Sequence, residues 1–182
     1  LLVASMKIAE GGRAIGPAPL AVSFEGNGFR SLATRTDTNT ITKFTWDFGD
    51  GSPVVENQNI SEGVQVQQHT YSVPGRYIAT LKVQDREGEQ STAAYPVHIG
   101  DGQAPIASIV YTPSFPLTGN VATLFTFDGS ASVNAQGTET GLDYAWDFGD
   151  GSALASDPQV THQYAKVGTY TVTLTITDNL AS

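Results

Sequence analysis

Several short stretches of this chain alternate apolar and polar residues, which is the period-two pattern of β-strands with one buried face. The clearest is Tyr170–Thr177, in which apolar residues alternate with threonines, and Tyr77–Gln84 has the same pattern. Shorter alternating runs surround Val22 and Phe44, and Gly, Pro, Asn and Asp residues between the runs predict turns. No stretch of ten or more residues has the 3.6-residue period of an amphipathic helix. The pattern therefore predicts an all-β protein.

The chain also contains an internal repeat. The seven residues WDFGDGS at 46–52 recur at 146–152, an offset of 100. Upstream, Val22–Phe24 matches Phe125–Phe127 at an offset of 103, and downstream an H-x-Y-x-x-x-G-x-Y stretch recurs at an offset of 93. Because the matching blocks keep their order, the repeat predicts two homologous domains. We expect them at residues 1–99 and 106–182, joined by a short linker at residues 100–105.

Each repeat has features of an immunoglobulin-like antiparallel β-sandwich of roughly seven strands. One tryptophan, Trp46 or Trp146, lies on a core-facing strand position in mid-domain. The tyrosine of the H-x-Y pair, Tyr71 or Tyr164, lies where a tyrosine corner is expected, with its hydroxyl bonded to nearby backbone. The Asp-Gly step of each repeated motif predicts a tight turn with a positive φ at its glycine, Gly51 and Gly151.

Composition narrows the possible functions. The 182 residues carry 9 basic and 18 acidic groups, and residues 101–182 hold Lys166 alone against eight acids, so a nucleic-acid partner is not expected. No apolar run approaches the ~20 residues of a membrane span, so we expect no membrane insertion in this segment. The absence of cysteine excludes disulfides and thiolate metal sites.

The repeated WDFGDGS motif, with the H-x-Y and G-x-Y that follow it, resembles the PKD domain of polycystin ectodomains, prokaryotic surface proteins and secreted hydrolases. The resemblance extends over nearly the whole chain, as one such domain in each repeat. It implies a noncatalytic β-sandwich that spaces, stiffens or mediates contacts in extracellular, cell-surface or secreted proteins, and that binds calcium in some members. The first 99 residues include a candidate final strand, Ser91–Ile99, which has no counterpart before Ser182, so we expect the second sandwich to lack its last strand.

The acidic residues of the motif permit two interpretations. Asp47 and Asp50, with Asp147 and Asp150 in the second repeat, could be paired carboxylates for glycoside hydrolysis. The favoured alternative is that they are turn residues that bond to their own backbone. His69 and His162 occupy the same place in separate domains, so we expect structural histidines rather than a shared zinc site. The sequence predicts no enzyme activity.

The candidate metal site involves other acids. Asp85 and Asp178 each continue the inward side of an alternating strand by one step, where a carboxylate needs compensation from N–H groups, a cation or Ca²⁺. The family resemblance implies that calcium-binding members combine this strand-end Asp with a loop acid and groups at the domain entrance. Those positions would be Asn134, Asp101 and Gln103 in the second repeat and Asp37 in the first, where the entrance is cut off at Leu1.

Two functions remain open at this stage. We expect a noncatalytic spacer or structural tandem in a surface, secreted or filament-forming protein. The alternative is a binding module that docks a glycan, a matrix protein or a neighbouring subunit, and it would need an exposed aromatic patch. The aromatics not assigned to inward positions are Tyr111, Phe115, Phe29 and Tyr95.

The end of the second repeat predicts a partner. Without a last strand, Tyr170–Thr177 would be an open sheet edge that can pair with another strand. We expect that strand from a neighbouring domain of the parent chain or from an adjacent subunit.

Overall fold

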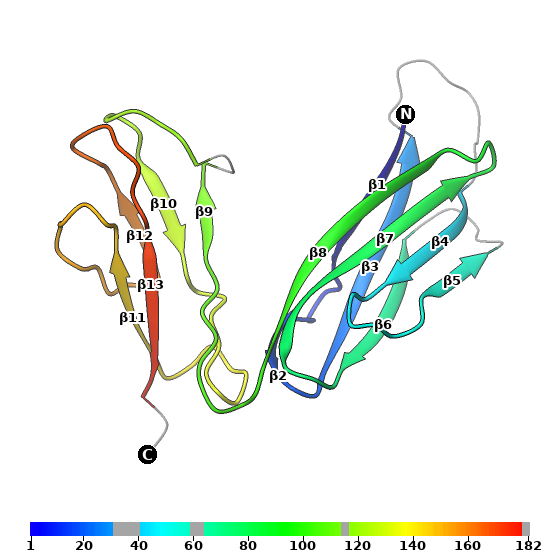
Figure 1. The fold of residues 1–182 in the computed structure, drawn as a ribbon, viewed down its shortest axis with the longest axis horizontal. Helices are drawn as coiled ribbons and strands as arrows, with labels where there is room; N and C mark the ends of the chain where they lie inside the picture. Colours follow the sequence, from blue (N-terminus) through cyan, green and yellow to red (C-terminus); the bar gives the residue numbers. More distant parts are fainter. Residues whose placement is uncertain (31–40, 59–63, 114–116, 180–182) are drawn as a thin grey trace. The chain divides into compact units, whose positions relative to one another are not determined.

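The computed structural model describes residues 1–30, 41–58, 64–113 and 117–179, which form two compact units (Figure 1). The first comprises Leu1–Ala14 and Ala18–Ile99, and the second comprises Ile15–Pro17 and Gly100–Ser182. All regular elements of the described residues are β-strands, as predicted. Within this part of the chain there is no helix long and apolar enough to cross a lipid bilayer. The predicted metal ligand Asp37 and the aromatic Phe115 lie outside the described residues.

The first unit is a sandwich of two antiparallel sheets. One sheet has the strand order β1-β3-β6, and the other contains β8, β7, β4 and β5 in that order. Side chains from both sheets meet in one core, as shown by Phe24 and Trp46, which are at most 1% exposed. The strands are β1 (Leu2–Ile8), β3 (Leu20–Arg30), β4 (Ile41–Asp47), β5 (Val55–Gln58), β6 (Gln65–Tyr71), β7 (Gly75–Asp85) and β8 (Gln90–Gly100).

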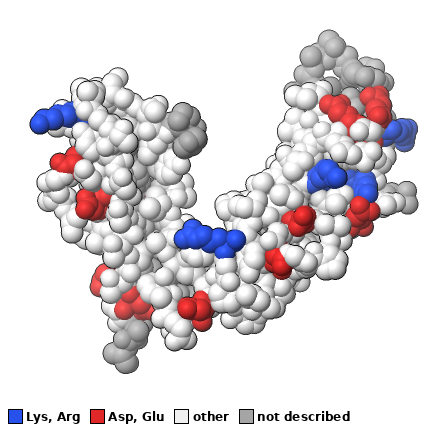
Figure 2. Space-filling view, in the orientation of Figure 1, with Lys and Arg blue, Asp and Glu red and all other residues white. Residues whose placement is uncertain are grey.

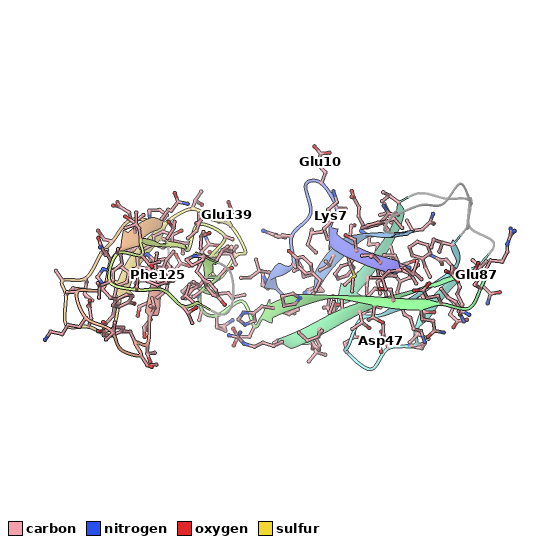
Figure 3. The ribbon with its side chains drawn as sticks, turned by 90° about the horizontal axis from the view of Figure 1, so that it is seen from above. Lys7, Glu10, Asp47, Glu87, Phe125 and Glu139 are labelled. Atoms are coloured by element: carbon pink, nitrogen blue, oxygen red, sulfur yellow. The ribbon has the colours of Figure 1, made fainter. Side chains whose placement is uncertain are left out.

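The second unit repeats this plan with fewer regular strands in its described part. Its sheets are β12-β10-β9 and β11-β13, and their inner faces enclose a smaller core around Trp146 and Phe127. Phe125, from β10, lies among the side chains in the interior of this unit (Figure 3). The strands are β9 (Val110–Thr112), β10 (Phe125–Asp128), β11 (Leu142–Asp147), β12 (Gln159–His162) and β13 (Thr173–Asp178). The contacts of the short strand β2 (Ile15–Pro17) group it with this unit.

The strand predicted at Tyr170–Thr177 is wrong at its beginning, because β13 starts only at Thr173. Thr173 corresponds, at the 93-residue offset, to Thr80 of β7. Thr80 is also the first residue of β7 that pairs with β4, whereas the preceding residues 75–79 pair with β8 alone. Among the described residues β13 pairs only with β11. Residues 168–172 therefore lack the ladder that keeps residues 75–79 in a strand.

Candidate functional site

The repeated motif forms the same turn in both units, directly after β4 and after β11. Asp47 Oδ1 accepts a hydrogen bond of 2.9 Å from the backbone N–H of Gly49. Gly49 has a φ of +74°, and a Cβ atom at this position would collide with the carbonyl oxygen of Ile78. The turn therefore requires glycine for two reasons, namely its backbone conformation and its close approach to β7. Asp147 and Gly149 repeat this arrangement, with a hydrogen bond of 2.8 Å.

Asp50 is the centre of a small polar cluster. Its Oδ1 accepts hydrogen bonds from the backbone N–H and the hydroxyl of Ser52, at 3.0 and 2.6 Å. Its Oδ2 lies 2.7 Å from Nε2 of His69. The imidazole of His69 stacks on Phe48, with ring centroids 4.0 Å apart and 3° between the planes. One histidine thus joins an aromatic ring of the motif to a carboxylate of the same motif.

The second unit reproduces this cluster. His162 Nε2 lies 2.8 Å from Asp150 Oδ2, and the imidazole stacks on Phe148 with a centroid distance of 4.0 Å. Sequence reasoning predicted a bonded histidine and a turn acid, but it did not pair them. The signal that could have done so is that both residues recur together in the two repeats.

The His–Asp pair connects the two sheets of each sandwich. Asp50 follows β4 in one sheet, whereas His69 belongs to β6 in the other. In the second unit, Asp150 follows β11 in one sheet, and His162 is the last residue of β12 in the other. The motif therefore closes one end of each sandwich through side chains that come from both layers.

Electrostatics determine which partner donates in this pair. Burial of Asp50 opposes its ionisation, but hydrogen bonds from Ser52 and His69 outweigh burial and lower the pKa of Asp50 to about 2. In the second unit, hydrogen bonds from Ser152 and His162 lower the pKa of Asp150 to about 2. Both carboxylates are therefore ionised at neutral pH and can only accept. It follows that each imidazole carries a hydrogen on Nε2 and donates the hydrogen bond to the carboxylate.

The tyrosines occupy roles different from those predicted. The hydroxyl of Tyr71 donates to the backbone carbonyl of Phe48 at 3.0 Å, across the sandwich rather than to backbone just upstream. The hydroxyl of Tyr77 instead donates to the carbonyl of Val73, four residues upstream, at 2.8 Å. The tyrosine-corner assignment of Tyr71 is therefore wrong, and Tyr77 makes that kind of contact. The second unit agrees, with Tyr164 bonded to Phe148 and Tyr170 bonded to Lys166.

Asp85, the first strand-end acid, organises the turn between β7 and β8. It is 2% exposed, and its Oδ1 accepts hydrogen bonds from the N–H groups of Glu87 and Glu89 at 2.9 and 3.0 Å. Glu87 marks this turn at the end of the unit (Figure 3). Backbone N–H groups thus supply compensation for this buried carboxylate.

The second strand-end acid, Asp178, lies beside the loop that contains Asn134. Its Oδ2 accepts a hydrogen bond of 3.3 Å from the N–H of Ala135. Asn134 is 1% exposed, and its Oδ1 already accepts the N–H groups of Gln136 and Thr138. As an amide oxygen has two lone pairs, Asn134 does not fit as a calcium ligand while both bonds persist.

Of the other predicted ligands, Asp101 Oδ1 accepts the N–H of Gln103 at 3.0 Å. A Cβ atom on Gly102, between them, would lie 3.8 Å from the carbonyl oxygen of Ala135, so this turn lies beside the loop that contains Asn134. The described residues contain no group of three or more His, Cys, Asp or Glu side chains that could hold a metal ion. Figure 2 shows the acidic groups of the second unit spread along the viewed face rather than gathered in one patch. Calcium binding stays a prediction.

Two of the four candidate recognition aromatics pack against the cores. Tyr95 packs against the core of the first unit and Tyr111 against that of the second. Phe29 is 48% exposed and is the one aromatic residue among the exposed large hydrophobic side chains of the described residues. A platform of several exposed aromatic rings is therefore not present in this part of the chain.

The chain is similar in sequence to segments of two known proteins. The chain is 26% identical to human polycystin-1 over 162 residues, which is 80% of this chain and 4% of that protein. It is 45% identical to collagenase ColA of Clostridium perfringens over 53 residues, or 29% of this chain and 4% of that protein. The chain thus spans only a small part of either relative.

The solved structures that the chain matches include the PKD1 domain of the Vibrio cholerae metalloprotease PrtV. It is 21% identical, with a TM-score of 0.39, and the match covers 54% of this chain and 95% of that domain. A family model described as the PKD domain matches this chain twice, at residues 16–99 and 103–180. With both repeats matched over most of their length, the chain belongs to the PKD domain family.

Proposed function

We propose that this chain is a noncatalytic structural tandem that spaces or stiffens neighbouring parts of a larger extracellular protein. The observation that supports the proposal is the repeated Asp–His pair. In both units the polar side chains of the motif bond within their own domain, and the pair joins the two sheets. A carboxylate that is ionised and bonded to its own turn suits the maintenance of a fold better than proton transfer to a substrate.

The similarity to segments of polycystin-1 and of a collagenase supports a module that accompanies other domains. The extracellular location is part of the same proposal. The alternative role in glycan docking receives less support, because Tyr95 and Tyr111 pack against the cores rather than forming an exposed stacking surface.

The experiment is a domain replacement in the longer protein. One variant deletes residues 1–182, and a second replaces them with an unrelated tandem of two β-sandwiches of matched length. A spacer predicts that the deletion impairs the function of the flanking domains and that the replacement restores it. If the replacement fails as the deletion does, although the flanking domains are folded and present in equal amount, the chain contributes specific recognition and the proposal is wrong.

A further inference from the structure

The strand β6 forms one margin of a sheet in the first unit, because the strand order of that sheet is β1-β3-β6. The seven residues of β6, Gln65–Tyr71, include no Lys, Arg, Asp, Glu or Pro. Charged residues and proline are the usual means by which proteins prevent an exposed sheet edge from pairing with another chain. The edge of β6 therefore lacks this protection.

Two observations show which backbone groups of β6 point away from its sheet. In an antiparallel ladder the N–H and C=O of one residue point to the same side, and successive residues alternate between the two sides. The carbonyl of Ser23 in β3 accepts the N–H of Ala9 at 2.8 Å, on the side of β1. Gln68 lies opposite Ser23, so its own N–H and C=O point away from β3. The side-chain amide of Gln67 donates to this carbonyl at 3.1 Å, which agrees with an outward direction.

The same alternation directs the backbone groups of Val66 and Thr70 outward with those of Gln68. Within the described residues, none of the three forms a backbone hydrogen bond on this side of β6. Their side chains are exposed on the outer face of the sheet. Glu25, which lies opposite Val66 on that face, is already paired with Lys7 at 2.8 Å. The free edge is thus uncharged and offers donors and acceptors at three alternate residues.

Two other margins of the first unit differ from β6. At the margin formed by β1, the N–H groups of Leu2 and Ala4 donate to the side chains of Glu89 and Ser91, each at 3.0 Å. The margin formed by β5 has only four residues and carries the exposed side chain of Glu56. Of these three margins, β6 is therefore the one that can best accept a further strand.

We propose that the edge of β6 is a self-association site, at which the β6 strands of two copies pair antiparallel about a two-fold axis. The free groups set the register, in which Gln68 of one copy lies opposite Gln68 of the other and Val66 lies opposite Thr70. Every outward N–H and C=O of these residues then has a partner, which gives about six main-chain hydrogen bonds. The β-branched side chains of Val66 and Thr70 adjoin across the two copies, which is a favourable cross-strand pair.

A second copy is the occupant that this edge fits. Its free groups at Val66, Gln68 and Thr70 are spaced symmetrically about Gln68, so a copy related by a two-fold axis presents the same groups in the order required. The edge is also uncharged in a chain whose net charge is −9, so two copies can meet here without placing like charges opposite one another. A contact through one pair of strands is small, and the dimer is accordingly weak and reversible. This pairing goes beyond the proposed spacer role and does not depend on it.

The test is sedimentation equilibrium of the 182-residue chain at concentrations up to about 1 mM, where a monomer–dimer equilibrium is expected. Val66→Lys with Thr70→Lys should raise the dissociation constant at least about tenfold, because lysines would face each other in both cross-strand pairs. Val66→Lys with Thr70→Glu should stay within about threefold of the unmodified chain, because opposite charges then face each other. The matched control is Gln90→Lys with Ala94→Lys, which adds two lysines at the same spacing on exposed positions of β8 and should change the constant less than about twofold.

Amide hydrogen exchange locates the contact. The amides of Val66, Gln68 and Thr70 should become protected as the protein concentration rises, whereas those of Gln67 and His69, which point towards β3, should not change. A chain that stays monomeric at about 1 mM, or protection confined to other strands, would overturn the proposal. Equal effects of the two lysine pairs, or equally weak association of the Lys–Lys and Lys–Glu variants of β6, would also overturn it.

Discussion

The imidazole of His69 lies flat on the ring of Phe48, with centroids 4.0 Å apart and an angle of 3° between the planes. The ring of Tyr71 lies perpendicular to the same imidazole, with centroids 4.7 Å apart and 88° between the planes. With Nε2 directed at Asp50, this histidine is enclosed by partners from its own domain. The repeated motif therefore links the turn after β4 to β6 within one domain.

Removal of this imidazole should destabilise the first unit. We expect His69→Ala to lower the free energy of unfolding by roughly 1 to 3 kcal/mol, because a hydrogen bond to an ionised carboxylate and a stacked ring contact are both lost. Urea unfolding followed by tryptophan fluorescence measures the change. The control is His98→Ala, which removes a half-buried imidazole from β8. Equal effects of the two substitutions would contradict the structural role of His69.

Acid should weaken both units within a defined range. The pKa of Asp50 and of Asp150 is about 2 in the folded chain, against an ordinary value of 3.8. A carboxyl with a lowered pKa stabilises the fold above its unfolded pKa, and this contribution is lost as the pH falls from about 4 to about 2. Unfolding curves recorded across this range should show the loss.

Substitution of the carboxyl isolates this contribution. Asp50→Asn should flatten the acid dependence of the first unit and also reduce its stability at pH 7. The matched control is Asp47→Asn, in the same unit, at an exposed position that accepts one backbone N–H. An Asp50→Asn variant with the wild-type acid profile would show that Asp50 is not the group responsible.

The two glycines of each turn should differ in their tolerance of alanine. Gly49 and Gly51 both have positive φ values, but a Cβ on Gly49 would meet the carbonyl of Ile78, whereas one on Gly51 would meet nothing within 4 Å. Gly51→Ala should cost roughly 1 to 2 kcal/mol from backbone conformation alone. Gly49→Ala should cost roughly 1 to 3 kcal/mol more, from the added steric conflict.

The second unit offers an independent repetition of this comparison. Gly149 would place its Cβ 2.5 Å from the carbonyl oxygen of Thr171, and Gly151 again has open space. Denaturant unfolding of the four single variants should give the same order in both units. Equal costs at the paired positions would mean that the turn does not approach the neighbouring backbone, at Ile78 or Thr171, as the structure shows.

Calcium binding at Asp178 is testable through stability. A bound ion would raise the unfolding temperature of the second unit in millimolar calcium, because ligand binding to the folded state alone stabilises it. The variant Asp178→Ala should abolish that rise, and Thr177→Ala should not. An unfolding temperature that responds neither to calcium nor to a chelator would contradict the metal prediction.

The sequence predicted the fold where a local pattern determines it. Alternation located β7, and the repeat located the turn glycines and predicted a tandem of two β-sandwiches. It misplaced the start of β13, because a strand also depends on a neighbour that a local pattern does not contain. It also assigned the tyrosine corner to Tyr71 rather than Tyr77, since either hydroxyl can reach backbone and only the folded geometry separates them.

Local sequence patterns did not predict the Asp–His pair, because its two members are distant in the sequence. Its members are 19 residues apart in the first unit and 12 in the second, and they meet because two sheets stack. The turn of Asp85 is similar, since its carboxylate becomes a buried acceptor only when β7 and β8 form a hairpin.

The most direct test of the central claim is detection of the imidazole protons of His69 and His162 by NMR. A structural pair with an ionised aspartate requires a proton on Nε2 of each ring, held in a hydrogen bond that slows its exchange with water. We predict slowly exchanging Nε2–H signals for both histidines at pH 7, with that of His69 lost in Asp50→Ala and that of His162 lost in Asp150→Ala, because alanine removes the acceptor oxygen. Rings protonated only on Nδ1, or Nε2 protons that exchange as fast as those of a free imidazole, would contradict the account.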